Sequence, residues 1–148
     1  MIDRSLIGTT LPERSIEVEK YPLRFFVETI GAEDPAHRDE AIARAAGYRS
    51  LLAPPTYVAC LALLADPDPD ALLRLLNVDA KKVLHGEQRF TYRHAICAGD
   101  RLRFNSRIAD IYDKKNGALE FVVLDTTVTN QLDQMVVELR SIMVVRHS

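Results

Sequence analysis

The apolar positions of this chain repeat with a helical period in the first half and alternate with polar positions in the second half. Over residues 20–30 the apolar side chains fall three or four positions apart, which predicts a helix with one buried face. Pro22 suits the first turn of this helix, and Gly31 suits its end. A shorter helix is predicted within residues 39–47, with Asp39 near its N-terminus. The residues between the two helices are expected to form a loop.

The longest apolar run, "TYVACLALLA" (residues 56–65), has apolar residues nearly all round. A helix of this composition is normally buried on most sides. Pro54 and Pro55 fix the backbone for the start of such a helix. A turn and a short amphipathic helix are expected next, in residues 66–76. Residues 56–65 are therefore predicted to form the central helix of the fold.

Alternation of apolar and polar residues predicts four antiparallel strands in the second half and a short strand at "SIEV" near the N-terminus. The dipeptide Asn116-Gly117 is a strong signal for a hairpin between two of them. In the second strand, Leu102, Phe104 and Ile108 are expected to point inward. The four strands are expected in residues 84–95, 100–112, 119–129 and 134–146.

Together these elements predict a single α+β domain over residues 1–148. A strongly curved antiparallel sheet would wrap around one long central helix, which is the arrangement of a hot-dog fold. The length of 148 residues is sufficient for one domain with its own core. No linker, internal repeat or low-complexity segment divides the chain.

Composition and charge exclude several classes of function. Apolar residues make up 47% of the chain, charged residues make up 27%, and the formal net charge is -2. No basic run is present, so a nucleic-acid partner is not expected. The apolar run is far shorter than the ~20 residues of a membrane span, so no membrane association is expected either. Two distant cysteines without a CxxC motif, and a polar N-terminus unlike a signal peptide, predict a cytoplasmic protein.

Three stretches resemble the MaoC-like hydratase/dehydratase family: "GAEDPAHRDEAIARAAG", "LLAPPTY" and "LHGEQRFTYRHAICAGDRL". More narrowly, they are similar to the N-terminal, FAS1-like dehydratase domain of two-part (R)-specific enoyl-thioester hydratases. They are also similar to the small subunits of mycobacterial-type (3R)-hydroxyacyl-thioester dehydratases. The resemblance implies a lyase that adds water to, or removes it from, an acyl thioester of coenzyme A or acyl carrier protein, without a cofactor.

The active loop of this family usually reads G-D-x-N-P-x-H, and its Asp and His activate one water molecule as base and acid. Gly31, Pro35 and His37 match this motif in the present chain. Ala32 stands where the resemblance places the catalytic Asp, and Asp34 replaces the Asn. One of the two acid–base groups is therefore missing from the expected position.

A second departure lies at the start of the central helix. In the family, a backbone N–H, usually from a glycine, stabilises the thioester oxygen at this point, and the helix dipole reinforces it. Pro54 or Pro55 occupies the corresponding position here, and proline has no N–H to donate. The two departures together predict a chain that does not run the hydratase reaction by itself.

His37 is the candidate general acid or base, with Asp34, Glu33 or Asp39 as its partner, and His37 and Asp34 are taken as the candidate catalytic pair. The alternative interpretation of His37 is a loop histidine that caps the following helix or forms a hydrogen bond at the surface. Six residues are candidates for the wall of an acyl tunnel, with packing in the core as the alternative for most of them. They are Pro55, Thr56, Tyr57, Cys60, Phe90 and Tyr92.

Two other polar groups favour ordinary structural interpretations. His85 and Glu87 are expected to share one strand face, but two ligands are too few for a catalytic zinc site, and no metal is expected. Arg101, Arg103 and Arg107 favour a charged strand face over the contacts that some relatives make with coenzyme A phosphates.

Three functions fit these observations. The first is a non-catalytic, acyl-binding half that acts with a hot-dog partner carrying an intact G-D-x-N-P-x-H loop. The second is a self-sufficient homodimeric hydratase or thioesterase that uses His37. The third is an acyl-CoA-binding protein without catalytic activity. A homodimer, or a heterodimer with another MaoC-like chain, is expected because joining two sheets edge to edge covers their exposed strand edges.

Overall fold

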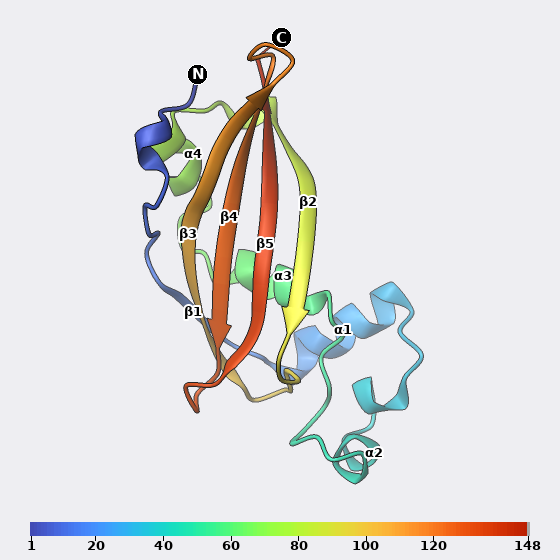
Figure 1. The fold of residues 1–148 in the computed structure, drawn as a ribbon. Helices are drawn as coiled ribbons and strands as arrows, with labels where there is room; N and C mark the ends of the chain where they lie inside the picture. The colour runs from blue at the N-terminus through green and yellow to red at the C-terminus, as the bar shows by residue number, and fades with distance from the viewer. Residues whose placement is uncertain (148) are drawn as a thin grey trace.

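The computed structural model describes residues 1–147, and its elements follow the predicted order (Figure 1). The helices are α1 (Lys20–Ile30), α2 (Glu40–Ala45), α3 (Tyr57–Leu64) and α4 (Ala71–Leu76). The strands are β1 (Arg14–Glu17), β2 (Val83–Tyr92), β3 (Arg101–Lys114), β4 (Leu119–Thr129) and β5 (Met135–Arg146). Short 3-10 turns lie at Arg4–Leu6, Pro35–His37 and Ala80–Lys82. The second of these turns lies within the segment that the sequence predicts as a plain loop.

The five strands form one antiparallel sheet in the order β1-β3-β4-β5-β2. The β3–β4 connection confirms the predicted hairpin. Lys115, Asn116 and Gly117 adopt positive φ angles of 53°, 55° and 82° there, a conformation that Asn and Gly tolerate best. β1 and β2 are the two edge strands of the sheet, and β2 is the longer of them.

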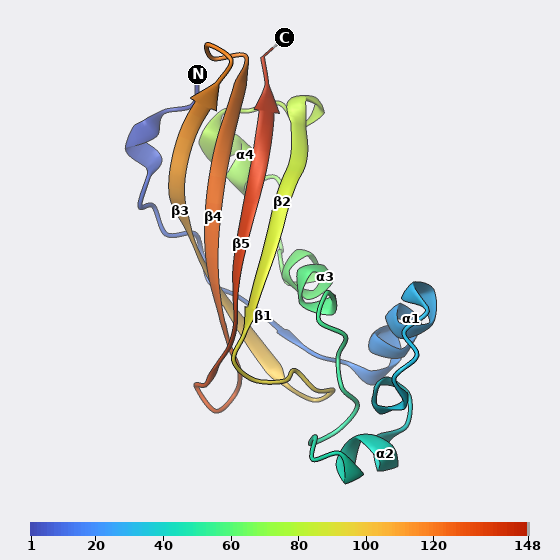
Figure 2. The same cartoon turned by 45° about the vertical axis from the view of Figure 1, so that its right-hand side comes forward.

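The main core lies between α3 and the sheet face that it crosses (Figures 1 and 2). Leu102 and Phe104 of β3 and Val128 of β4 are fully buried against Val58 and Leu61 of α3. Burying each such side chain stabilises the fold by roughly 1.5–3 kcal/mol. The predicted inward orientation of Leu102, Phe104 and Ile108 is confirmed, since all three are fully buried.

α3 is shorter and more exposed than the sequence predicts. It spans eight residues, of which Tyr57, Val58 and Leu61 are buried. Leu63 and Leu64 are 75% and 64% exposed. The expected burial of this helix on most sides therefore fails at its C-terminal end, because the sheet covers only one side of α3. The open side is apolar and accessible.

β2 contains a β-bulge at Gly86. His85 and Glu87 pair with successive residues of β5, so the strand carries one extra residue at this point. An extra residue reverses the alternation of side chains, and His85 and Glu87 therefore face opposite sides of the sheet. The prediction that they share a face is wrong. Among residues 1–147, no group of three His, Cys, Asp or Glu side chains could hold a metal ion.

A smaller core closes the sheet at the end opposite the β4–β5 turn, and it includes Ile2, Leu76 and Val145. Glu120 is buried beside it and accepts the Ile2 N–H at 2.9 Å. The His147 Nε2 lies 2.5 Å from the second carboxylate oxygen of Glu120. These contacts fasten both ends of the described chain to β4. No helix of the described part is long and apolar enough to cross a membrane.

Candidate functional site

The loop between α1 and α2 takes its shape from local sequence. Gly31 ends α1 in the left-handed conformation (φ 64°), which glycine adopts without steric cost. Asp34 is extended, as expected before a proline, and its carboxylate accepts the Ala36 N–H at 2.9 Å. This hydrogen bond caps the Pro35–His37 turn. The loop therefore presents His37 at its C-terminal end.

His37 is buried, with 8% of its surface exposed. Its Nδ1 lies 2.8 Å from the carbonyl oxygen of Leu52. A carbonyl can only accept, so Nδ1 carries a proton and donates it, and Nε2 is the basic nitrogen of the neutral ring. The helix that follows is capped by the Asp39 carboxylate and not by His37. His37 therefore does not cap this helix, and its hydrogen bond to a backbone carbonyl is buried instead of lying at the surface.

The side chains of Asp34 and His37 do not meet. Within residues 1–147, no side-chain hydrogen bond or ion pair joins them, and the Asp34 carboxylate is engaged by a backbone N–H instead. Ala32, in the position of the family's catalytic Asp, packs against the main core. The loop thus provides one imidazole without a second acid–base group in contact with it.

The hydrogen bond of His37 predicts a graded effect on stability. His37→Ala removes the donor to the buried Leu52 carbonyl, and we expect it to lower the free energy of unfolding by about 1–3 kcal/mol. His37→Asn keeps a donor close to the Nδ1 position and should cost less than half as much. Urea unfolding followed by circular dichroism measures both. Equal losses in the two variants would contradict a structural role for this bond.

The start of α3 offers no N–H donor at the expected position. Pro54 is buried and Pro55 is exposed, and neither has an N–H group. Thr56 is the first residue after them that carries an N–H. The Tyr57 N–H already donates to the Pro54 carbonyl at 3.0 Å. A thioester oxygen placed at Pro54 or Pro55 would therefore find no backbone donor there.

Tyr92 connects the end of β2 to the start of α3. Its hydroxyl donates to the Pro55 carbonyl at 2.6 Å. Burial raises the pKa of Tyr92 to about 12, so the hydroxyl keeps its proton and remains a donor at neutral pH. A cavity of about 330 Å³ lies beside this contact. It is lined by Leu52, Ala53, Pro55, Tyr92 and residues 93–96.

The six predicted substrate-binding residues gather at this end of α3 and β2. Pro55 and Tyr92 line the cavity, and Thr56 is exposed beside them. Tyr57 is buried in the main core, where its ring centroid lies 4.8 Å from that of Phe26. Cys60, Phe90 and Tyr92 are half-buried against the same core. The Leu52 carbonyl that binds His37 belongs to a residue of the cavity wall, which joins the loop to this region.

Leu52 is a member of the site that sequence reasoning missed. It contributes a backbone carbonyl, and a carbonyl carries no residue-specific signal. The Tyr92–Pro55 contact joins residues 37 positions apart, so the hydrogen bond becomes visible only in the fold. The three arginines of β3 each contact a carboxylate, as a charged strand face requires. The pairs are Arg101–Glu17 at 3.8 Å, Arg103–Asp133, and Arg107–Asp125 at 3.7 Å.

Solved structures of hydratases and dehydratases share this architecture. The chain is similar to one in the C-terminally truncated HadBC (3R-hydroxyacyl-ACP dehydratase) complex of Mycobacterium tuberculosis, with a TM-score of 0.78 and 27% identity over 94% of this chain and 96% of that chain. A chain of the ChsH1–ChsH2 complex of the same organism matches with a TM-score of 0.76 and 21% identity, over 93% of this chain and 88% of that one. The (R)-hydratase from A. caviae matches with a TM-score of 0.69 and 16% identity, over 93% and 94% of the two chains. The predicted hot-dog fold is confirmed.

Sequence comparison gives the family. The chain is 34% identical to a UPF0336 protein of Saccharopolyspora erythraea over 98% of its own length and 92% of the relative's length. It is 33% identical to a UPF0336 protein of Thermobifida fusca over 98% and 94% of the two chains. The model of the "FAS1-like, dehydratase domain region" matches residues 5–139. The chain therefore belongs to the FAS1-like dehydratase-region family.

Proposed function

We propose that this chain is the acyl-binding, non-catalytic half of a two-chain MaoC-like hydratase/dehydratase. The observation that carries the proposal is the candidate loop, where Ala32 packs into the core at the position of the catalytic Asp and leaves His37 without an acid–base partner. A second hot-dog chain with an intact G-D-x-N-P-x-H loop would supply both catalytic groups. The present chain would supply one wall of the acyl tunnel, formed by Tyr57, Cys60, Phe90 and their neighbours.

The loss of rate expected from the two missing groups supports this assignment. A positioned general acid or base contributes ~10²–10⁴ to the rate. An oxyanion donor contributes about 10²–10³. The chain has an alanine in place of the first group and prolines in place of the second. Catalysis by its own loop would therefore be slower than catalysis by an intact loop by several orders of magnitude.

Two open surfaces support a partner of the same fold. The exposed side of α3 presents Leu63 and Leu64 to solvent. Among residues 1–147, β2 pairs only with β5, so its other edge has free backbone groups that a second strand can bind. The HadBC and ChsH1–ChsH2 structures, to which this chain is similar, are both complexes. A partner sheet joined at β2 would bring a second helix against the open side of α3.

Hydration of crotonyl-CoA tests the proposal. The loss of enoyl absorbance would be followed with the purified chain alone and with the chain co-expressed with a MaoC-like protein that carries the intact motif. We expect a stable heterodimer that turns over and a single chain that does not. Rapid turnover by the single chain would overturn the proposal.

A self-sufficient homodimeric hydratase or thioesterase is the second candidate, because the buried His37 has a basic nitrogen, Nε2, in its neutral form. It requires turnover by the chain alone that disappears in His37→Asn. A third outcome, tight acyl-CoA binding without turnover and without any heterodimer, would identify an acyl-CoA-binding protein instead. The same two preparations therefore separate all three functions.

A further inference from the structure

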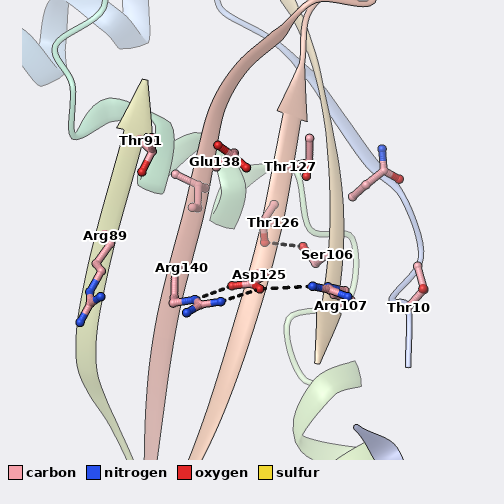
Figure 3. Close-up of a pocket in the computed structure, with 12 residues that line it drawn as sticks. Thr10, Arg89, Thr91, Ser106, Arg107, Asp125, Thr126, Thr127, Glu138 and Arg140 are labelled. Carbon is pink, nitrogen blue, oxygen red and sulfur yellow. Dashed lines mark hydrogen bonds and ion pairs between the residues drawn. The ribbon is translucent and has the colours of Figure 1, made fainter. Parts of the chain in front are cut away.

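A second hollow lies on the face of the sheet that points away from α3 (Figure 3). Phe104 faces α3, and side chains alternate along a strand, so Asn105 and Arg107 face the other way. The hollow has a volume of about 620 Å³, which suits a small organic molecule. Outward-facing residues of four strands and one residue of the N-terminal segment line it. They are Arg89 and Thr91, Glu138 and Arg140, Asp125 and Thr127, Asn105 and Arg107, and Thr10, and the buried residues Ser106, Thr126 and Leu139 complete the lining.

A row of charged residues crosses the sheet beneath this hollow. Arg89 of β2 is paired with Arg140 of β5, Arg140 with Asp125 of β4, and Asp125 with Arg107 of β3. The row contains three guanidinium groups and one carboxylate. Like charges directly opposite each other on neighbouring strands destabilise a sheet, and Arg89 and Arg140 form such a pair. The row therefore carries an excess of positive charge that a bound anion would relieve.

Both acidic residues of the hollow are already engaged by arginines. Arg140 donates to the two oxygens of Asp125 at 2.7 and 2.9 Å, and Figure 3 shows this contact together with the longer one to Arg107. The Arg140 guanidinium, and to a smaller extent that of Arg107, holds the pKa of Asp125 below its usual value. Glu138 accepts a hydrogen bond from Arg93 at 3.0 Å. The two carboxylates are therefore shared among Arg93, Arg107 and Arg140, and within the described chain neither forms an ion pair with Arg89.

Arg89 and Arg107 retain hydrogen-bond donors for a ligand. The Arg107 side chain is 63% exposed, and its one ion pair within the described chain is the 3.7 Å contact with Asp125. Among the described residues, Arg89 donates a hydrogen bond to Glu87 through Nε, and no hydrogen bond is donated by its two terminal nitrogens. Guanidinium groups present forked donors that match phosphate oxygens. The threonine hydroxyls and the Asn105 amide add neutral partners around them.

We propose that this hollow binds a small, polar, phosphate-bearing molecule through Arg89 and Arg107, on either side of the Arg140–Asp125 pair. The composition of the lining defines the ligand class. It contains no aromatic residue, and Leu139 is its one apolar residue. A fatty acyl chain would find no matching surface. Threonine, asparagine and arginine side chains suit phosphate oxygens and hydroxyl groups instead.

Inorganic pyrophosphate is the probe. Its binding to the full chain would be measured by isothermal titration at constant ionic strength, because screening by added salt would otherwise obscure the comparison. We expect saturable binding to the unmodified protein and about tenfold weaker binding for Arg107→Gln and for Arg89→Gln, the loss of one charge-assisted contact each. Arg140 is kept, because its removal would take away both hydrogen bonds that it donates to Asp125.

Arg101→Gln is the matched control. It removes the same charge from β3 at an exposed position outside the hollow, so it should bind pyrophosphate as the unmodified protein does. The absence of saturable binding at millimolar pyrophosphate would overturn the proposal. Equal weakening by Arg101→Gln and Arg107→Gln would also overturn it, because the attraction would then come from overall charge. Both outcomes are independent of hydratase activity.

Discussion

In the proposed heterodimer, His37→Asn is expected to leave kcat/KM for crotonyl-CoA within about threefold of the unmodified complex, whereas His→Asn in the partner's motif is expected to lower it by ~10²–10⁴. The asymmetry follows from the geometry of the loop. His37 is tied to the Leu52 carbonyl, and Ala32 occupies the place of the second catalytic group. Asparagine preserves the donor to Leu52, so the substitution removes proton transfer while disturbing the fold little. Steady-state kinetics on the two variant complexes measures the difference.

The stability of both complexes is the necessary control. Each variant heterodimer should elute as the unmodified one does in gel filtration, so that a loss of activity reflects chemistry and not dissociation. Similar large losses in both variants would mean that His37 takes part in proton transfer across the interface. That result would show that both chains supply catalytic groups, and it would contradict a non-catalytic role for this chain.

Phe104→Ala is expected to lower the free energy of unfolding by about 3–5 kcal/mol. Phe104 is fully buried in β3, between Arg14 of β1 and Val128 of β4, and belongs to the core that α3 covers. The Arg14 guanidinium lies 5.9 Å above its ring. Truncation would remove the favourable free energy of burying the ring. It would also leave a cavity that the rigid neighbouring strands cannot fill. Unfolding in guanidinium chloride, followed by circular dichroism, measures the change.

Phe25→Ala provides the matched control for this substitution. Phe25 lies on α1 and is 69% exposed, so the same truncation should change stability by no more than about 0.5 kcal/mol. A small effect at both positions would show that the interface between α3 and the sheet does not stabilise the chain. A large effect at Phe25 alone would show that packing around α1 contributes more to the free energy of unfolding than packing between α3 and the sheet.

The sequence predicts the elements of this chain well, because their signals are local. Gly31 and Pro22 define α1, and Asn116-Gly117 defines the β3–β4 hairpin, through conformations that these residues adopt by themselves. The family motif likewise identifies the loop from Gly31 to His37. Alternation fails at Gly86, where one extra residue reverses the faces of β2. Nothing in the local pattern of residues distinguishes that bulge from a regular strand.

The candidate site was predicted in part. The sequence identifies His37, the alanine at the catalytic position and the two prolines, since each is a matter of residue type. It does not reveal that the Asp34 carboxylate caps its own turn, or that His37 donates to Leu52. The sequence also does not predict the outward-facing row of charged residues, because its members come from four different strands. They are Arg89, Arg140, Asp125 and Arg107.

The order of helices and strands, the family, and the alanine and prolines at the positions where the resemblance places catalytic groups can all be read from the sequence, because periodicity, turn residues and residue identity are properties of the chain alone. The contacts between side chains that are distant in the sequence become visible only in the tertiary structure. It exposed one side of α3, separated His85 from Glu87, and assembled the arginine-lined hollow. The physical reason is that strand register and the packing of α3 on the sheet bring together residues whose separation along the chain carries no local signal.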